Sequence, residues 1–266
     1  MIFILLPAYN EKSSIIPLIS GLRKTIRKTK EQYRIVIVND GSIDSTKKFI
    51  EKIKGKDIHV LNHKINRGLG ETIRDGLEYI SSRARDNDII IRLDCDVTHE
   101  PKYIPLLVKK INRGADIVIC SRFQKGGGSR GVSRYRNSIS QCANVILKIL
   151  FPIRGVREYS CGYRAYRASL IKKAIEIYGN DFISLKGLGF TCTVEKIIKL
   201  RELTTAKKIQ EIPFVLRYDK KEGPSKMLSS ITTLGYFALI LKSIYPWGKV
   251  AKERQKKIAY YRKFKK

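Results

Sequence analysis

The sequence predicts an α/β protein with a mostly parallel sheet covered by helices on both faces. Short apolar runs alternate along the chain with segments whose apolar residues recur at helical spacing. Two of the runs, 34–38 and 89–93, are nearly continuous in apolar residues, as expected of strands that are buried on both faces. With 266 residues, 43% of them hydrophobic, the chain can bury a large core in one large or two small domains.

The expected strands, in chain order, are 2–6, 34–39, 59–61, 89–93 and 116–120. The first lacks the basic start and the longer apolar stretch of a signal peptide, so we interpret it as a buried strand. In open α/β sheets ligands bind beyond the carboxyl ends of the strands. The polar segments 7–11, 40–44 and 94–96 each follow one of these strands, and we therefore expect the functional site there.

Two later regions differ in composition from the rest. Residues 122–136 contain four glycines together with Lys125, Arg130 and Arg134, which predicts a mobile loop. The fifteen uncharged residues 227–241 are too few to span a bilayer unaided. A tail at 251–266 follows, with eight basic residues and one acidic residue.

The charge of the chain points to an anionic partner. The 54 Lys and Arg residues against 24 Asp and Glu give a net charge of +30, more than solubility requires. Nucleic acid, an anionic membrane surface and a phosphorylated substrate all fit this charge. The five cysteines are widely spread without a Cys-x-x-Cys pair, which argues against a disulfide framework or a zinc site and favours a reducing compartment.

Two carboxylates at the end of the fourth expected strand form a candidate metal site. Asp94 and Asp96 are two residues apart, so their side chains share one side of an extended chain. Like charges this close need a counter-charge, and a hard cation such as Mg²⁺ or Mn²⁺ takes oxygen ligands. Thr98 and His99 are further candidate ligands, although a lone histidine is more often structural. The alternative is a solvated acidic pair at a strand end.

The segment after the second expected strand has a turn composition. In Asp40-Gly-Ser-Ile-Asp44, Gly41 allows close approach of the backbone and Asp44 can cap a helix starting near Ser45. A functional interpretation adds a hydrogen bond from Asp40 to a nucleobase or ribose. The segments 7–11 and 66–70 also allow two interpretations: each is either a plain connection between a strand and a helix or part of a binding site.

Two enzyme classes fit the motifs poorly. Residues 89–98 resemble the opening signature of haloacid-dehalogenase-type phosphatases, but the later Asp residues, at 116, 181 and 219, are too isolated to form the second acidic pair of that class. A dinucleotide-binding oxidoreductase would carry Gly-x-Gly-x-x-Gly after its first strand, whereas this chain has Pro-Ala-Tyr-Asn-Glu.

The motifs together resemble those of inverting nucleotide-sugar glycosyltransferases with the GT-A fold, glycosyltransferase family 2. They are Pro-Ala-Tyr-Asn-Glu at 7–11, Asp-Gly-Ser-x-Asp at 40–44, Asn-x-Gly-x-Gly at 66–70, Asp-x-Asp at 94–96 and Cys-Ser-Arg at 120–122. Within that superfamily the chain is most similar to dolichol-phosphate mannosyltransferases and related polyprenyl-phosphate glycosyltransferases. The runs at 94–101, 159–164 and 222–227 carry this likeness, which covers about residues 2–227.

The resemblance implies a role for each matching residue. The donor nucleotide would be bound by Pro7, Tyr9, Glu11, Asp40 and Asp94. A Mg²⁺ or Mn²⁺ ion on the donor diphosphate would be held by Asp94, Asp96 and Thr98. The acceptor phosphate would be bound by Arg122, Arg136, Ser140, Arg217 and Lys226, and Asp96 and Arg122 would be the catalytic residues.

The implied reaction moves mannose or another hexose from a GDP- or UDP-sugar to a polyprenyl (dolichyl) phosphate, with inversion. A phosphate monoester has a second pKa of about 6, so this acceptor is already largely dianionic at neutral pH. A sugar hydroxyl acceptor would need a general base. No Asp lies between Asp181 and Asp219, which favours a phosphate acceptor, although Glu195 is a candidate base.

The resemblance also suggests where the protein works. We expect a GT-A domain at 1–218, followed at 219–266 by an acceptor loop, a membrane-interface helix over 227–247 and the basic tail. The net charge would then attach a peripheral or monotopic protein to anionic lipid at the cytoplasmic membrane face. The plainer alternative for 227–247 is a core helix followed by a solvated tail.

Two other functions remain as alternatives. The first is a glycosyltransferase that elongates a polysaccharide or glycolipid. The second is a basic nucleic-acid-binding protein, but aromatic residues do not interleave with the basic runs as a base-stacking surface requires. We therefore expect no nucleic-acid partner.

Overall fold

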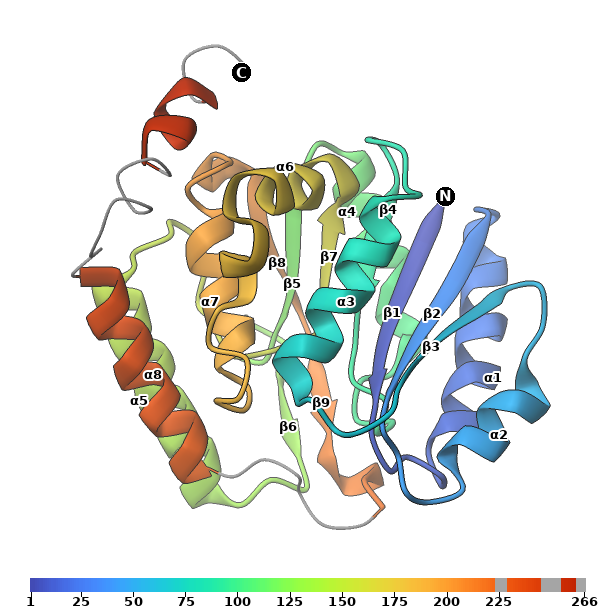
Figure 1. The fold of residues 1–266 in the computed structure, drawn as a ribbon. Coiled ribbons are helices and arrows are strands. Elements are labelled where there is room, and N and C mark those ends of the chain that lie inside the picture. The colour runs from blue at the N-terminus through green and yellow to red at the C-terminus, as the bar shows by residue number, and fades with distance from the viewer. Residues whose placement is uncertain (223–228, 245–254, 262–266) are drawn as a thin grey trace.

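The computed structural model describes residues 1–222, 229–244 and 255–261. Its described strands form a seven-stranded sheet of order β3-β2-β1-β4-β7-β5-β8 and a separate two-stranded ladder, β6-β9 (Figure 1). The strands are β1 (Ile2–Ala8), β2 (Tyr33–Asp40), β3 (Ile58–His63), β4 (Ile89–Arg92), β5 (Ile117–Ser121), β6 (Gly128–Arg130), β7 (Arg164–Arg167), β8 (Ile209–Pro213) and β9 (Val215–Arg217). The main helices are α1 (Ile15–Ile26), α2 (Thr46–Ile53), α3 (Leu69–Ser81), α4 (Ile104–Asn112), α5 (Arg134–Leu150), α6 (Ala168–Tyr178), α7 (Thr191–Leu200) and α8 (Ser229–Ile244).

The sheet is parallel except for β7, which runs antiparallel between β4 and β5. All five expected strands are confirmed, with ends that shift by one or two residues. The sequence analysis missed β7 and β8. The four residues of β7 carry an arginine at each end, and so they lack the apolar run by which a buried strand is recognised.

Helices cover both faces of the sheet, as the sequence predicts. On one face α1, α2 and α4 pack against alternate residues of the central strands, among them Ile4, Ile37 and Ile91. On the other face α3, α6 and α7 pack against the intervening residues, and α5 and α8 each add a buried leucine, Leu147 and Leu239. The central strands are thus buried on both sides, which explains their nearly continuous apolar sequence.

The glycine-rich region at 122–136 is more ordered than the sequence suggests. Gly128–Arg130 pairs in parallel with Val215–Arg217, and the amide of Gly128 donates to the carbonyl of Phe214 at 3.0 Å. The helix α5 begins at Arg134, where the Ser133 hydroxyl accepts a hydrogen bond from the amide of Arg136. The prediction of a mobile loop is therefore wrong for 128–130 and from residue 134 onward.

The C-terminal region returns to the main core. Leu239 in α8 and Tyr261 are buried in the same apolar cluster as α6 and α7. Among the described helices, none is both long and apolar enough to cross a membrane. Lys226, the two ends of the expected interface helix at 227–247 and most of the basic tail lie outside the described residues. The domain boundary at residue 218 stays a prediction.

We predict that Gly76→Ala destabilises the protein, because α3 lies close against the sheet at this residue. A Cβ atom at Gly76 would lie 2.3 Å from Cδ1 of Leu5 and 3.0 Å from Cγ2 of Val38, both fully buried. Overpacking of this kind costs about 1–3 kcal/mol, against a gain of about 1 kcal/mol for alanine over glycine within a helix. Urea unfolding measures the net loss.

Gly187→Ala is the matched control, since no atom lies within 4 Å of a Cβ at that position. Equal stabilities for the two variants would contradict the packing argument.

Candidate functional site

The loops at the carboxyl edge of the sheet are joined by hydrogen bonds between the segments that follow β1 and β2. The amide of Asn10 donates to Ser42 Oγ, and the amide of Ile43 donates back to Asn10 Oδ1, each at 3.0 Å. The amide of Glu11 donates to Thr46 Oγ1 at 2.7 Å. In Figure 1 the chain begins at the upper end of β1, so this edge is the lower one. The two motifs therefore form one unit at the predicted end of the sheet.

Asp40 holds a neighbouring loop in place. Its side chain is 3% exposed, and its two oxygens accept the amide hydrogens of Arg67 and Gly68, each at 2.9 Å. His63 Nδ1 lies 2.6 Å from the same carboxylate. These partners give Asp40 a structural role in positioning the start of α3. Its contact with a nucleoside stays a prediction.

The other residues around the predicted nucleoside site have simpler surroundings. The N-cap of α2 is Ser45, and Asp44, one residue earlier, accepts the amide hydrogen of Thr46 through Oδ1 at 2.9 Å. Pro7 is buried within β1, and Tyr9 is half-buried just after it. Glu11 accepts a hydrogen bond from Ser14 Oγ near the start of α1.

Asp94, Asp96 and Thr98 come together in the turn after β4, as the sequence predicts. Asp96 Oδ1 accepts hydrogen bonds from the amide and the hydroxyl of Thr98, at 3.3 and 2.6 Å. Between them Val97 has a φ of 56°, in the left-handed region that a β-branched residue rarely adopts. The turn is thus held in a strained conformation that presents both carboxylates at one edge.

Each of the two carboxylates faces a cation of the protein itself. Asp94 Oδ1 accepts a 2.5 Å hydrogen bond from Nη2 of Arg92, and the Lys221 ammonium donates to Asp96 Oδ2. Burial alone would raise the pKa of Asp96, but nearby charges, Lys221 foremost, and hydrogen bonds from Lys221 and Thr98 together outweigh burial, and the pKa lies below its ordinary value. Asp96 is therefore ionised, and its carboxylate binds a cation.

His99 is a structural residue of this turn. Its ring is 3% exposed and stacks on Tyr163 at 5.3 Å between ring centroids. Its Nδ1 accepts the amide hydrogen of Asp94 at 2.9 Å. Burial lowers the pKa of His99 despite the nearby carboxylates, which favours the neutral ring that can accept this bond. The structure thus supports the structural alternative for this histidine.

Lys221 is a site residue that the sequence analysis missed. It is 125 residues from Asp96, and it follows the short turn after β9. The neighbouring Lys220 binds Glu100 at 2.7 Å, so two consecutive lysines attach this segment to the turn after β4. Sequence reasoning chose Lys226 from the same region because of its motif.

Arg122 and Ser140, the two central residues of the predicted acceptor site, are in contact. Nη2 of Arg122 donates to Ser140 Oγ at 3.0 Å and to Ser160 Oγ at 2.9 Å. Glu158 binds the same guanidinium through both oxygens, at 2.8 and 2.9 Å. The sequence analysis treated Glu158 only as a departure from the family pattern. The structure shows it to be the counter-ion of Arg122.

The Arg122–Glu158 pair is buried, and its charges are mutually stabilised. Burial would raise the pKa of Glu158, but Arg122 keeps it below its ordinary value. Burial would lower the pKa of Arg122, but Glu158 raises it above its ordinary value. Both groups therefore stay ionised, and the guanidinium is fixed in position beside Ser140.

Arg136 contacts Tyr218, the residue that follows Arg217 in the chain. Arg136 Nη1 donates to the Tyr218 hydroxyl at 3.3 Å, and its guanidinium lies 5.5 Å from the centre of that ring. Arg217 forms a two-bond ion pair with Asp219 and lies 3.5 Å from Glu100. Their predicted contact with an acceptor phosphate stays a prediction.

Glu195 is not placed to act as a general base. Its side chain is buried in α7, where it accepts hydrogen bonds from the amides of Ser184 and Leu185 and from the Lys199 ammonium. A carboxylate with these fixed donors holds a loop together. The interpretation of Glu195 as a candidate base is therefore wrong.

Three cations lie in the interior close to Asp94. Arg92 on β4 and Arg164 on β7 are fully buried, and Lys196 on α7 is 1% exposed. Burial, with the charges of Arg92 and Arg164, lowers the pKa of Lys196 to about 7. The sequence analysis did not single out Arg92, which lies among apolar residues in the expected strand 89–93. Tertiary packing alone reveals this cluster.

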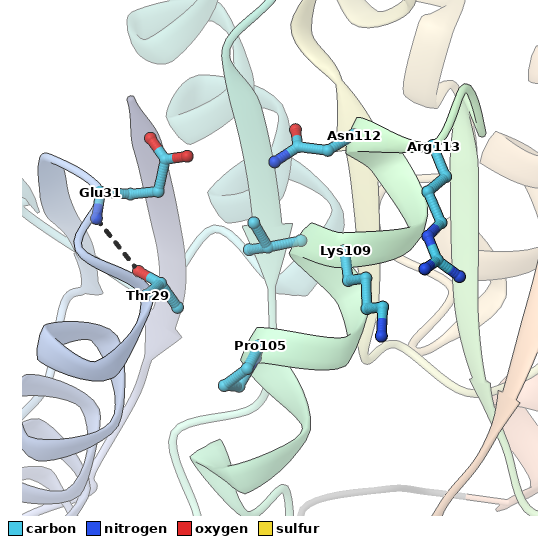
Figure 2. A pocket seen from close by; sticks show the side chains of 7 residues that line it. Thr29, Glu31, Pro105, Lys109, Asn112 and Arg113 are labelled. Atoms are coloured by element: carbon cyan, nitrogen blue, oxygen red, sulfur yellow. Dashed lines mark hydrogen bonds between the residues drawn. The ribbon is translucent and has the colours of Figure 1, made fainter.

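A shallow depression lies at the opposite edge of the sheet. It is lined by Thr29, Glu31, Pro105, Val108, Lys109, Asn112 and Arg113 (Figure 2). Thr29 and Glu31 precede β2, and Asn112 and Arg113 lie where α4 ends before β5, so these residues mark the amino ends of the strands. The depression is separate from the site at the carboxyl edge.

We predict that Lys196 makes wild-type stability fall as the pH is lowered from about 10 to about 7. In that window the unfolded chain holds the lysine proton and the folded chain does not. The free energy of unfolding should decline by up to about 1.4 kcal/mol per pH unit relative to Lys196→Met, and level off below about pH 7.

Urea unfolding of wild type and Lys196→Met between pH 6 and pH 10 measures this difference in the free energy of unfolding. Both proteins contain Cys192, so the titration of its thiol in the unfolded chain cancels in the difference. A difference that does not change with pH would contradict the buried, depressed lysine.

Comparison with known proteins agrees with this arrangement. The model of the family described as "Glycosyl transferase family 2" matches residues 3–175. The polyprenol monophosphomannose synthase of Mycolicibacterium smegmatis is 26% identical over 230 residues, 85% of this chain and 81% of that protein. The undecaprenyl-phosphate mannosyltransferase of Micrococcus luteus is 29% identical over 229 residues, 85% of this chain and 87% of that protein.

Two more comparisons concern longer or more distant proteins. The dolichol-phosphate mannosyltransferase of Pyrococcus furiosus is 28% identical over 84% of this chain, which spans 58% of that protein. The structure of glucosyl-3-phosphoglycerate synthase from Mycobacterium tuberculosis with Mn²⁺, UDP and glucosyl-3-phosphoglycerate has a TM-score of 0.61 at 17% identity, covering 91% of this chain and 79% of that one. That likeness confirms the GT-A-like α/β fold. With its matched motifs and fold, the chain belongs to glycosyl transferase family 2.

Proposed function

We propose that this glycosyltransferase moves a hexose, such as mannose, from a nucleotide sugar to the phosphate of a polyprenyl lipid at the cytoplasmic face of a membrane. The observation that carries the proposal is the pairing of two features at one sheet edge. The acidic turn Asp94–Asp96 follows β4, and Arg122, directly after β5, contacts Ser140 of α5. The first suits a donor diphosphate with its cation, and the second suits an acceptor phosphate.

The residues of the acidic turn fit Mg²⁺ or Mn²⁺. Asp94, Asp96 and Thr98 offer oxygen ligands, and an ammonium group already occupies one oxygen of Asp96. Within the described residues, no group of three or more His, Cys, Asp or Glu side chains is placed to hold a metal. Two carboxylates alone suit an ion whose remaining ligands come from a substrate diphosphate.

When bound, such an ion would neutralise charge that develops on the leaving diphosphate. In the proposed reaction a phosphate oxygen of the acceptor forms a bond to the anomeric carbon while the bond from that carbon to the diphosphate oxygen breaks. Arg122 would orient the attacking phosphate, because Glu158 fixes its guanidinium beside Ser140. No proton needs to leave a dianionic phosphate, so a general base is unnecessary.

This last point favours a phosphate acceptor over a sugar hydroxyl. Elongation of a polysaccharide or glycolipid would need a base. Glu195, the one acid that the sequence left for that role, is committed to Ser184, Leu185 and Lys199. Names of the relatives point the same way, since three of them describe mannose transfer to polyprenyl or dolichol phosphates. Family membership leaves the nucleic-acid-binding alternative without support.

Exposed apolar residues on two helices support membrane attachment. On α8, Leu234, Phe237 and Leu241 share one helix face and are each more than 60% exposed. On α5, Ile139, Ile146 and Ile149 form a second stripe at helical spacing. Sequence analysis expected only the first of these. Arg122 binds Ser140 on α5, and its charge acts on the pKa of Tyr236 on α8. Both helices therefore lie next to the proposed acceptor site (Figure 1).

We predict transfer from a GDP- or UDP-hexose to a short polyprenyl phosphate in the presence of Mn²⁺, detected by mass spectrometry. Asp96→Asn should lower turnover about 10²-fold, because one charge that offsets the leaving diphosphate is lost. The control Lys109→Met, at the opposite edge of the sheet, should retain full activity. Product formed only on sugar acceptors would contradict the proposal.

We further predict that Ile146→Glu with Ile149→Glu weakens binding to vesicles of anionic phospholipid at least about tenfold, because two charges replace buried apolar contacts in the headgroup region. Vesicle sedimentation measures the bound fraction. Ile16→Glu, on an exposed position of α1, is the matched control. Equal binding by the three proteins would show that α5 does not touch the membrane.

A further inference from the structure

Two fully buried arginines face each other in the centre of the sheet. Arg92 on β4 and Arg164 on β7 are register partners of an antiparallel pair, so their side chains leave the sheet on the same face. Like charges directly opposite each other are unfavourable even in exposed strands. Gly162 makes room for this arrangement, since a Cβ there would lie 1.2 Å from Arg92 Nη1. The chain therefore accommodates the pair at some cost.

The hydrogen-bond donors of this pair exceed the acceptors around them. Arg92 Nη2 binds Asp94, but Nε and Nη1 of Arg92 are buried without a hydrogen-bond partner among the described residues. Arg164 donates to the carbonyls of Tyr159 and Thr193, while its Nε is also buried and unpartnered there. Buried donors of charged groups are costly to leave unsatisfied.

Charge is unbalanced in the same place. Lys196 on α7 joins the two arginines, and it takes part in none of the salt bridges formed by the described residues. Asp94 supplies one negative charge, and Glu195, next to Lys196 in sequence, binds Lys199. Each uncompensated buried ion costs several kcal/mol. Two permanently charged guanidinium groups, joined by Lys196 when it is protonated, face this one carboxylate, and an additional anion would restore the balance of charge.

We propose that Arg92, Arg164 and Lys196 form an internal oxyanion-binding site that takes one carboxylate or phosphate-type group. The three cations would surround it from two strands and one helix, and the unpartnered Nε and Nη1 atoms would donate to its oxygens. Because Arg92 also holds Asp94, the site adjoins the acidic turn. The oxyanion could come from a free anion in solution or from a carboxylate on the donor sugar. Only the second of these sources rests on the proposed function.

Thermal unfolding of the full chain at neutral pH tests the free anion. Acetate and phosphate are compared with chloride at constant ionic strength. The unfolding midpoint of the wild type should rise by at least about 2 °C more than that of Lys196→Met. Lys109→Met, which removes an exposed lysine on the opposite side of the sheet, controls for general salt effects and should behave as wild type.

Calorimetric binding of matched donors with Mn²⁺ tests the sugar carboxylate. The pairs are UDP-glucose with UDP-glucuronate and GDP-mannose with GDP-mannuronate, and the carboxylated member of one pair should bind the wild type at least about tenfold more tightly. Lys196→Met and Lys196→Gln should both abolish that preference. Two variants are used so that misfolding of one does not decide the result.

A response in the first experiment assigns the site to a free oxyanion, and a response in the second assigns it to the donor. The inference would be overturned if wild type and Lys196→Met responded equally in the first experiment and wild type and both Lys196 variants responded equally in the second. Transfer to polyprenyl phosphate would then still stand or fall by its own assay, because it uses uncharged hexoses.

Discussion

The buried ion pair between Arg122 and Glu158 is the interaction on which the proposed acceptor side of the edge depends. Glu158 also accepts hydrogen bonds from Ser160 and from the amide of Cys161, so one carboxylate joins the end of β5 to the segment that leads into β7. Such a pair adds little net stability, yet loss of one partner leaves the other charge buried alone, at about 3–5 kcal/mol. The position of Arg122 is therefore fixed by the fold before any substrate arrives.

On the proposed donor side, the carboxylates at the edge are neutralised by cations that reach them from two directions. Arg92 reaches Asp94 from inside the sheet, and Lys221 reaches Asp96 from a segment more than a hundred residues away. A divalent cation at Asp96 would compete with the Lys221 ammonium for the same oxygen. The displaced ammonium would remain a positive charge close to the proposed donor diphosphate, and it would add to the charge of the cation.

Local sequence predicts the parts of the fold that depend on local pattern. The apolar runs of β1, β2, β4 and β5 and the acidic turn after β4 all lie within a few residues, so periodicity and spacing reveal them. By contrast β7 is short, and arginines flank it. Its place between β4 and β5 depends on pairing with strands far along the chain.

The same distinction explains the site residues. Arg122 and Ser140 came from a family resemblance, and the structure brings them into contact. Glu158 and Lys221 act through partners 36 and 125 residues away, and a single sequence carries no signal for such pairs. Glu195 was misread because its sequence shows a charge within a helix, but not the loop that surrounds that charge.

The apolar stripe of α5 has a practical consequence for handling the protein. Exposed isoleucines on a strongly basic protein favour adsorption to detergent micelles and to other copies of the chain. Apparent size in solution should then vary with concentration and with added detergent. The choice of detergent and protein concentration during purification will then determine how much monodisperse protein is obtained for crystallisation or spectroscopy.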